Sequence, residues 1–307
     1  MDTHKLIIIG SGPAGLTAAL YAARANLKPL VIGGFTYGGQ LMITSEVENF
    51  PGFPEGVQGP ELMQKMIDQA KRFGAEIIFE DAVKVEFGQK PFSVTSGSKT
   101  YQTESIIVAT GASSIWLGLP SEEKFRGKGI SSCATCDGFF FKEKDIIVVG
   151  GGDAALEEAL YLTKFAKKVT ILNRSDKLRA SQIMQDRAKA NPKISIEYNK
   201  AVEEFLGSDR LAGVKVKDSI SGKIEERPIE GAFIAIGHKP NTEIFAGQLK
   251  LDAKGYIEPI DQTKTNVEGV FVAGDVRDYR YRQAVTAAGW GCMAALDAEK
   301  YLHMDQG

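Results

Sequence analysis

The chain has 307 residues, which is too long for one small core and fits about two domains of ordinary size. Hydrophobic residues make up 43% and charged residues 25%, the proportions of a soluble globular protein. A formal net charge of -2, without a long run of Lys or Arg, excludes a general electrostatic attraction to nucleic acid. Three cysteines are too few for a secreted disulfide scaffold.

An apolar run near the amino end leads directly into a glycine-rich loop. Lys5–Ile9 predicts a buried parallel strand, and Gly10-Ser-Gly-Pro-Ala-Gly15 is a nucleotide-binding fingerprint. The uncharged stretch 6–23 superficially resembles a signal peptide, but the glycines and Pro13 would break an apolar helix at its centre. We therefore expect a strand that enters a nucleotide loop, in a cytoplasmic protein.

The first fingerprint opens a βαβ unit that lacks one usual residue. Residues 16–25 are rich in alanine and predict a helix, and Leu30–Ile32 predicts the next strand. The free N–H groups at the start of such a helix favour a phosphate. An acidic residue that holds the ribose usually follows the second strand, but Gly33-Gly34 stands there. The motif alone thus leaves the first cofactor open.

The next elements complete the first unit. Apolar residues at helical spacing predict a helix over 59–73, and residues 92–94 and 106–108 read as strands. The last of these strands ends in a tight turn at Gly111. The loop character of residues 113–120 indicates a domain boundary.

A second unit repeats the first one, and its fingerprint begins 140 residues later. Ile146–Val149 predicts a strand, Gly150-Gly-Gly-Asp-Ala-Ala155 is the second glycine loop, and residues 154–165 predict a helix. Val169–Leu172 predicts the second strand, and residues 233–237 close the unit. This pattern indicates an internal duplication of a nucleotide-binding half.

The remaining chain has its own strand and helix signals. Gly269–Asp275 reads as a strand followed by a turn, and residues 282–302 form an alanine-rich helical pattern. The whole succession predicts the α/β class, with two Rossmann-like nucleotide-binding domains.

The second fingerprint favours NADPH over NADH. An NAD site places an acidic residue near Asn173, where the second strand ends, to hold the ribose 2′-hydroxyl. Here Arg174 and Arg179 follow instead, and they can bind a 2′-phosphate through charge-assisted hydrogen bonds. The alternative is that both are ordinary solvated surface cations.

Cys133-Ala-Thr-Cys136 lies between the two fingerprints and has three interpretations. Two cysteines at this spacing can close a small disulfide ring and exchange with other disulfides. A pair of inert buried thiols is the second interpretation. A zinc site is the third, but it needs two more ligands, and the remaining Cys and His residues are scattered, at His4, His238, Cys292 and His303. We favour redox exchange and expect no metal.

Asp137 follows the second cysteine directly. A carboxyl group beside a thiolate can act as a general acid when the dithiol forms. Asp137 could equally cap a helix that starts at Gly138. Cys292 lies within the last helical pattern and is most simply a packing residue.

These motifs occur in the order of one known family: Gly10-Ser-Gly-Pro-Ala-Gly15, Gly38-Gly-Gln40-Leu, Glu46-Val-Glu-Asn49-Phe-Pro-Gly52, Cys133-Ala-Thr-Cys136-Asp137-Gly, Gly150-Gly-Gly-Asp-Ala-Ala155 and Gly274-Asp275. The chain resembles the low-molecular-weight thioredoxin reductases essentially from end to end. Glycine loops alone are weak evidence, but the ordered set with CATCDG between them is highly specific. The resemblance implies a homodimeric FAD enzyme that reduces thioredoxin with NADPH.

The resemblance also implies that FAD binds at the first fingerprint despite the missing acidic residue. Gln40 and Asn49 match family positions that hold the flavin, and Asp275 matches the residue that binds its ribityl chain. Arg282-Gln283-Ala284 matches the segment that faces the flavin pyrimidine edge. The residues expected to bind FAD are Gly10, Ser11, Gly12, Pro13, Ala14, Gly15, Gln40, Asn49, Thr110, Gly111, Gly274, Asp275, Arg282, Gln283 and Ala284.

One departure concerns the nicotinamide cofactor. The family often has two consecutive arginines after the second strand, whereas Ser175 stands in the second position here, which weakens the expected preference for NADPH. His238 matches a position in the family's IGHxPN turn, where either a turn residue or a catalytic role is possible. The residues expected to bind NADPH are Gly150, Gly152, Asp153, Ala154, Ala155, Arg174, Arg179, Ile236 and Gly237.

By the same resemblance, Cys136 faces the flavin, Cys133 attacks the partner disulfide, and Asp137 completes the catalytic group. The expected FAD-binding domain is discontinuous, over 1–115 and 246–307, and the NADPH-binding domain with the CxxC spans 116–245. The dithiol must touch the flavin and also reach a protein in solvent, which one rigid pose could hardly allow. We therefore expect the inserted domain to rotate between half-reactions.

Overall fold

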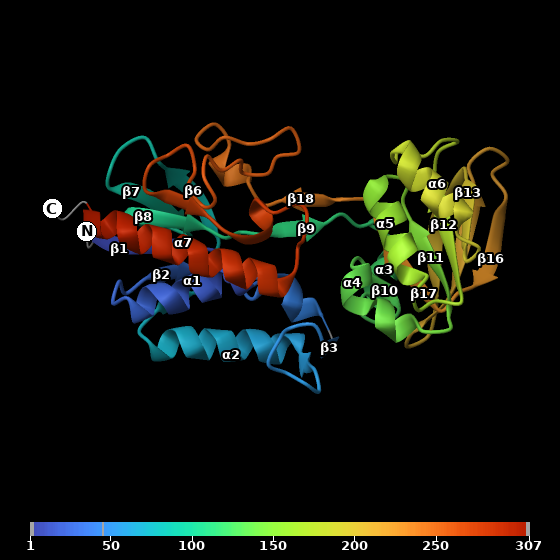
Figure 1. Ribbon diagram of the computed structural model, residues 1–307, viewed down its shortest axis with the longest axis horizontal. Coiled ribbons are helices and arrows are strands. Elements are labelled where there is room, and N and C mark those ends of the chain that lie inside the picture. The colour runs from blue at the N-terminus through green and yellow to red at the C-terminus, as the bar shows by residue number, and fades with distance from the viewer. Residues whose placement is uncertain (1–2, 45, 305–307) are drawn as a thin grey trace. The chain divides into compact units, whose positions relative to one another are not determined.

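The computed structural model describes residues 3–44 and 46–304. The chain forms two compact units, which we call unit 1 (Met1–Ser113 with Lys239–Gly307) and unit 2 (Ser114–His238). Unit 2 is therefore inserted, in sequence, into unit 1. The structure belongs to the α/β class, as the sequence predicts (Figure 1).

Unit 1 is built on a seven-stranded sheet with the order β5-β2-β1-β8-β7-β6, in which β19 also pairs with β8. In the parallel part, Ile9 of β1 lies beside Ile32 of β2 and Val108 of β8, so these strands end at one edge. The glycine loop follows β1 at this edge. The strands are β1 (Thr3–Ile9), β2 (Leu30–Ile32), β5 (Glu76–Ile78), β6 (Ala82–Glu86), β7 (Phe92–Ser96), β8 (Lys99–Val108) and β19 (Val270–Val272).

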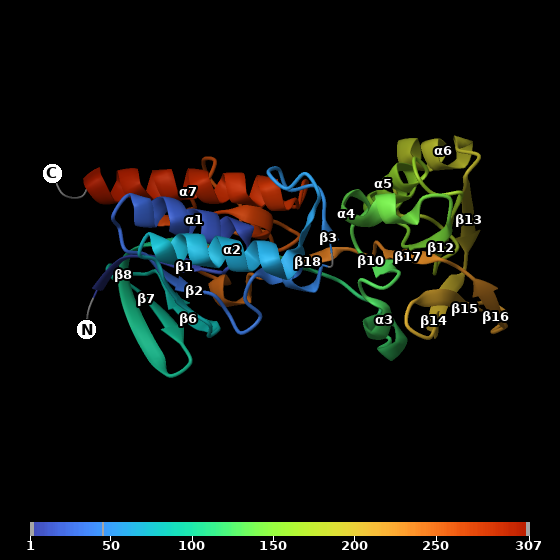
Figure 2. The ribbon, with the colours of Figure 1, turned by 90° about the horizontal axis from the view of Figure 1, so that it is seen from below.

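Helices cover one face of this sheet. Leu6 and Ile8 of β1 pack under the alanines of α1 and α7, whereas Ile7 and Ile9 belong to the core on the opposite face. Both views show α1 beside α7 (Figure 1, Figure 2), and a Cβ on Gly291 would lie 2.1 Å from the Ala14 oxygen. The other elements of unit 1 are α1 (Pro13–Arg24), α2 (Gly59–Arg72), α7 (Ala284–Met304), β3 (Glu46–Val47), β4 (Val57–Gln58) and the 3-10 helices η1 (Gly39–Ile43), η3 (Glu243–Phe245) and η4 (Gly274–Val276).

Unit 2 repeats the nucleotide-binding pattern on a five-stranded parallel sheet with the order β10-β17-β11-β12-β13. The sheet consists of β10 (Ile130–Ser131), β11 (Asp145–Val149), β12 (Lys168–Asn173), β13 (Ile194–Tyr198) and β17 (Gly231–Ile234). The helical elements are α3 (Pro120–Phe125), α4 (Ala134–Asp137), η2 (Gly138–Phe141), α5 (Asp153–Leu162) and α6 (Gln182–Ala190). The predicted duplication is thus present as β1-α1-β2 and β11-α5-β12.

The described part of the chain also forms three smaller sheets that the sequence does not predict, one of which pairs β3 with β4 in unit 1. An antiparallel sheet in unit 2 consists of β14 (Lys200–Gly207), β15 (Leu211–Asp218) and β16 (Ile224–Pro228). The two crossings between the units lie in β9 (Ala112–Ser114) and β18 (His238–Pro240), which pair with each other. No helix in the described part of the chain is long and apolar enough to cross a membrane.

Candidate active site

The two sulfurs of the CxxC are joined. Cys133 and Cys136 form a disulfide bond of 2.06 Å, and both residues are half-buried in unit 2. Cys133 precedes the short helix α4, whose first residue, Ala134, is buried against the core under α5. The packing of Ala134 against this core therefore holds the disulfide ring on one side. This geometry agrees with redox exchange and excludes a pair of separate inert thiols.

Asp137 lies beside the disulfide in an environment that favours its neutral form. Burial raises the pKa of this carboxyl group, and a hydrogen bond from Ser131 lowers the pKa in part. The Asp137 side chain does not cap the following 3-10 helix; instead its backbone N–H donates to the Cys133 oxygen at 3.1 Å. A carboxyl group that retains its proton more readily suits the predicted general acid.

The segment before Cys133 is fixed by two serines. The Cys133 N–H donates to Ser131 Oγ at 3.0 Å, and the hydroxyls of Ser132 and Ser114 lie 2.9 Å apart. Ser131 is buried on β10, so the cysteine is attached to the central sheet of unit 2.

The second glycine loop serves two separate needs. Gly150 has a φ of +151°, and a Cβ there would lie 2.4 Å from the Ala235 oxygen, so its glycine is required by the packing of the chain. Gly152 has an ordinary φ of -97°, and a Cβ there would meet no described atom within 4 Å beyond its chain neighbours. Packing among the described residues does not require glycine at position 152, whereas a closely approaching phosphate would.

The loop after β12 brings the predicted cations to this fingerprint. The Arg179 N–H donates to the Gly151 oxygen at 2.7 Å, and Asp153 Oδ1 accepts from Ser181 N and Oγ at 2.8 Å each. Asn173 Nδ2 donates to the oxygens of Ser175 and Lys177 and so shapes the loop. Arg174 and Arg179 are exposed, which leaves both guanidinium groups accessible to a ligand.

The first glycine loop has the same two-part design. A Cβ on Gly10 would lie 2.3 Å from the Ala109 oxygen, and one on Gly15 would lie 2.0 Å from the Gly10 oxygen. Gly12, with a φ of -71°, has an open position like that of Gly152. Ser11 Oγ donates to the Gly33 oxygen at 2.6 Å and accepts from the Gly38 N–H at 3.0 Å. Pro13 begins α1, and Ala14 is buried under α7.

Asp275 is a half-buried residue next to this loop in the fold, and its Oδ1 atom is buried. Burial, and next the charge of Asp278, raises the pKa of Asp275 to about 7, although Arg282 acts in the opposite direction. Asp275 Oδ1 has no hydrogen-bond partner within the described residues. A buried acceptor without a partner fits a site that receives a hydroxyl group from a ligand. A Cβ on the adjacent Gly274 would lie 2.8 Å from the Ala14 Cβ.

Distant segments supply the remaining expected FAD contacts. Asn49 Nδ2 donates to Gln283 Oε1 at 3.4 Å, which brings together two such residues from opposite parts of the chain. Gln40 is exposed on η1, and Ala284 is the first residue of α7. Arg282 precedes α7 with a φ of +49°.

The turn after β8 is held by a residue that sequence reasoning missed, Asn241, which follows β18. Thr110 Oγ1 donates to the Asn241 oxygen at 2.7 Å, and Asn241 Nδ2 donates to the Thr110 oxygen at 2.8 Å. The Asn241 N–H donates to the Gly111 oxygen, and Asn241 Oδ1 accepts from Ser113. Asn241 was visible in the IGHxPN turn, but only the fold shows that it holds the ends of unit 1 together. In unit 2, the Gly237 oxygen, next to Ile236, accepts from the Ile115 N–H.

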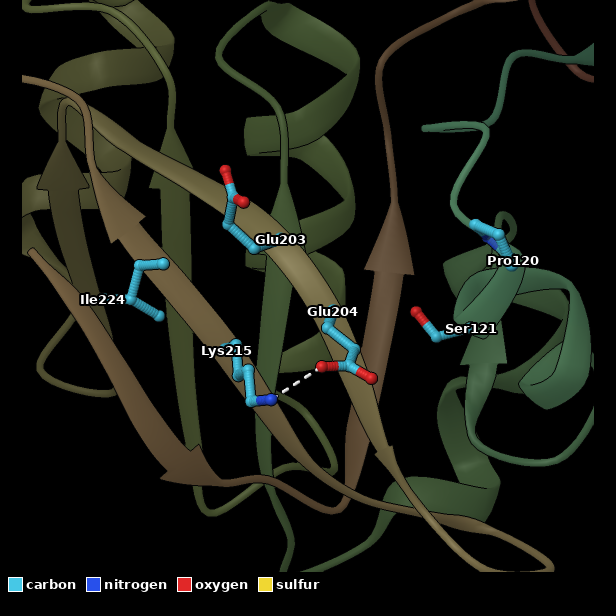
Figure 3. A pocket seen from close by; sticks show the side chains of 6 residues that line it. All are labelled: Pro120, Ser121, Glu203, Glu204, Lys215 and Ile224. Atoms are coloured by element: carbon cyan, nitrogen blue, oxygen red, sulfur yellow. Dashed lines mark hydrogen bonds and ion pairs between the residues drawn. The ribbon is translucent and has the colours of Figure 1, made fainter. Parts of the chain in front are cut away.

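Unit 2 contains a hollow of about 440 Å³ whose lining residues belong to none of these motifs (Figure 3). It contains the ion pair between Lys215 and Glu204, whose atoms are 2.7 Å apart. Its lining includes no cysteine and no fingerprint residue, so we do not assign it a role; the residues are Pro120, Ser121, Glu203, Glu204, Lys215 and Ile224.

Comparison with known proteins identifies the family. The model of the pyridine nucleotide-disulphide oxidoreductases matches residues 4–291. The chain is 56% identical to a thioredoxin reductase of Rickettsia felis over 98% of this chain and 99% of that protein, and 55% identical to one of Streptomyces coelicolor over 98% and 94%. The chain belongs to the thioredoxin reductases.

Solved structures agree with this assignment. A thioredoxin reductase from Giardia duodenalis superimposes with a TM-score of 0.94 at 42% identity, over 99% of this chain and 100% of that one. One from Streptococcus pyogenes also gives 0.94, at 41% identity, over 98% and 99%. The predicted family, the two Rossmann-like domains and the oxidoreductase class are thereby confirmed.

Proposed function

We propose that this enzyme reduces the disulfide of oxidised thioredoxin, with electrons that pass from NADPH to FAD and then to Cys133–Cys136. The observation that carries the proposal is the disulfide itself, which lies beside the partly buried Asp137 in a chain with two open glycine loops. When bound, FAD accepts hydride from NADPH and supplies the two electrons that reduce this disulfide.

Unit 1 supplies the residues that would hold FAD. The Gly12 position and the start of α1 accommodate a pyrophosphate, because free N–H groups and the helix dipole favour negative charge there. The carboxyl group of Asp275 would bind a hydroxyl of the ribityl chain, and Gln40, Asn49 and Gln283 would contact the flavin. In unit 2, Gly152 and the start of α5 would hold the NADPH pyrophosphate, and Arg174 and Arg179 its 2′-phosphate.

The chain's own thiols perform the exchange with thioredoxin. The Cys133 thiolate attacks one sulfur of the thioredoxin disulfide, forms a mixed disulfide and releases the other sulfur as a thiolate. The Cys136 thiolate then attacks Cys133 Sγ, which restores the Cys133–Cys136 bond and releases reduced thioredoxin. Asp137 takes the proton from the Cys136 thiol and returns one to a departing thiolate, a task that its raised pKa suits.

We also propose where the enzyme acts, its oligomeric state, its domains and the motion of one of them. The enzyme acts as a cytoplasmic homodimer, with an FAD-binding domain over 1–115 and 246–307 and an NADPH-binding domain over 116–245. The inserted domain rotates between half-reactions, since the disulfide and the nicotinamide both require a flavin face. A cross-link that locks the two domains should abolish turnover and leave one half-reaction intact; full turnover in the locked enzyme would refute rotation.

Anaerobic titration with NADPH tests the electron route. The purified protein should be yellow, and the wild type should accept more electron equivalents than its flavin alone can hold, because the disulfide takes two. Cys136→Ser should lose this extra uptake together with thioredoxin reduction, whereas Cys292→Ser, which changes the free cysteine, should retain both. A colourless protein that takes up no FAD would refute the proposal.

A further inference from the structure

The end of β2 lacks the acidic residue that usually binds the adenosine ribose, and the structure gives a physical reason. A Cβ on Gly33 would lie 3.1 Å from Ser11 Oγ and 3.2 Å from the Ile78 oxygen. Gly34 has a φ of +81°, and a Cβ there would lie 3.1 Å from Asp81 Oδ1. A carboxylate from another segment therefore lies in tight contact with the place that the Cβ of a side chain at position 34 would take.

Asp81 reaches this place because of the sheet. It follows β5, which pairs in parallel with β2 so that Ile78 lies beside Ile32, and both strands end at the same edge. The backbone N–H groups of Gly33 and Gly34 donate to the oxygens of Ile78 and Glu80 at 2.8 and 3.1 Å. The two segments thus run alongside each other beyond their strands.

One oxygen of the Asp81 carboxylate is fixed and the side chain is exposed. Asp81 Oδ1 accepts from the Phe35 N–H at 3.0 Å. A carboxylate has about four acceptor positions, so one such bond leaves room for two hydroxyl donors. The first glycine loop adjoins this corner, since Ser11 Oγ donates to the Gly33 oxygen.

We propose that Asp81 supplies, from the segment that follows the neighbouring strand β5, the carboxylate that binds the ribose hydroxyls of the adenosine half of FAD. This inference rests on the proposed binding of FAD at the first fingerprint. Gly33 and Gly34 are then explained as residues that make room for Ser11 and Asp81, and the missing acid of β2 is replaced rather than lost.

Flavin binding to the apoprotein tests the inference, with FAD and with an analogue that lacks both adenosine ribose hydroxyls. Wild type should bind FAD about tenfold or more tightly than the analogue, because a charge-assisted hydrogen bond is worth roughly 1.5–3 kcal/mol. In Asp81→Asn, which keeps an acceptor for the Phe35 N–H, this ratio should fall toward one. Glu80→Gln is the matched control, since Glu80 accepts from Ser96 Oγ instead.

The outcomes separate the two proposals. A ratio in Asp81→Asn equal to that of wild type, with normal FAD binding, would overturn the role of Asp81 and leave the proposed function intact. A ratio that collapses in Thr36→Val but not in Asp81→Asn would also overturn it, because the neighbouring hydroxyl would then bind the ribose. Failure of wild type to bind FAD would overturn both proposals.

Discussion

Individual side chains near the second glycine loop determine which nicotinamide cofactor is accepted. Arg174 and Arg179 carry the only predicted selectivity for a 2′-phosphate, and the bond from the Arg179 N–H to the Gly151 oxygen holds one of them at the loop. Ser175 contributes its backbone oxygen to Asn173 rather than a cation to the ligand. Selectivity therefore depends on two arginines separated by a short loop.

Reversing both charges, in Arg174→Glu/Arg179→Glu, should raise KM for NADPH by about tenfold or more and change KM for NADH much less, because each lost phosphate contact is worth roughly 1.4 kcal/mol or more. Steady-state kinetics with both cofactors measure this difference. Arg187→Glu, an exposed arginine on α6, is the control and should change neither value. An equal effect on both cofactors would contradict the assignment.

Asp275 gives stability a dependence on pH in protein stripped of nucleotide. Its pKa is about 7 in the folded state, against about 3.9 in an unfolded chain, so the folded state binds more protons between these values. The contribution of Asp275 to the stability of the folded state is fully present below about pH 4 and is lost as pH rises through about 7. Asp275→Asn should therefore gain stability over wild type between pH 4 and 8, up to about 4 kcal/mol.

Urea unfolding across this pH range measures the difference between the two proteins. Asp209→Asn, in the exposed turn between β14 and β15, should follow the wild-type curve at every pH. A constant difference between Asp275→Asn and wild type would show that the carboxyl group does not retain its proton in the folded state.

At the scale of elements, a buried carboxylate holds the segment of unit 2 that directly follows the first crossing. Glu122, in α3, accepts from the N–H groups of Leu117 and Gly118 at 3.0 Å each, and its carboxylate lies 3.8 Å from the Arg126 guanidinium. Arg126 in turn lies 4.2 Å from the centre of the Trp116 ring. These contacts fix residues 116–118 to unit 2, much as Asn241 fixes residues 110–113 to unit 1.

Glu122→Gln should cost about 1–3 kcal/mol of stability, because the amide NH₂ group cannot accept from the second backbone N–H, which is then buried without a partner. The urea midpoint of unfolding measures this loss. Glu123→Gln changes the next residue, which is exposed, and should unfold as wild type does. An unchanged midpoint in Glu122→Gln would mean that this carboxylate does not support the crossing.

The elements that sequence could predict share one property: their signals are local. Apolar runs that end in glycine predicted β1, β11 and the helices after them. Strands of a parallel sheet are buried on both faces, so their sequences are continuously apolar and need no alternation of apolar and polar residues. The β14-β15-β16 sheet was missed because charged residues pair across it, as Lys217 does with Glu203 and Lys215 with Glu204, and mask the apolar alternation. The CxxC and both fingerprints were found for the same local reason.

Site residues that act across long separations could not be found in this way. Asp81 meets Phe35 across 46 positions and Asn241 meets Thr110 across 131, so no spacing rule connects them. Only the sheet order, which places β5 beside β2, and the paired crossings bring these residues together.

At the scale of the whole molecule, the insertion of unit 2 predicts that the units can be separated. β9 and β18 pair, and Ser113 Oγ donates to Asn241 Oδ1 at 3.1 Å, so the cut ends of unit 1 lie close together. A chain that lacks residues 114–238, rejoined through a short glycine linker, should fold and bind FAD. It should show no reduction by NADPH, because the second fingerprint is gone.

Flavin absorbance with and without NADPH measures both properties, and residues 114–238 expressed alone should still form the Cys133–Cys136 disulfide. An excised unit 1 that stays unfolded, while its linker length is varied, would mean that the inserted unit is required for its core.

The same topology determines how the molecule responds to mechanical force. Thr3 in β1 and Met304 in α7, near the two ends of the described chain, both belong to unit 1. Unit 2 is connected to unit 1 only through the paired strands β9 and β18. A pull on the two ends is therefore borne first by β1, α7 and the sheet between them. The force acts on unit 2 only after unit 1 has unfolded. The dithiol and its surroundings are therefore mechanically shielded until the last stage of extension.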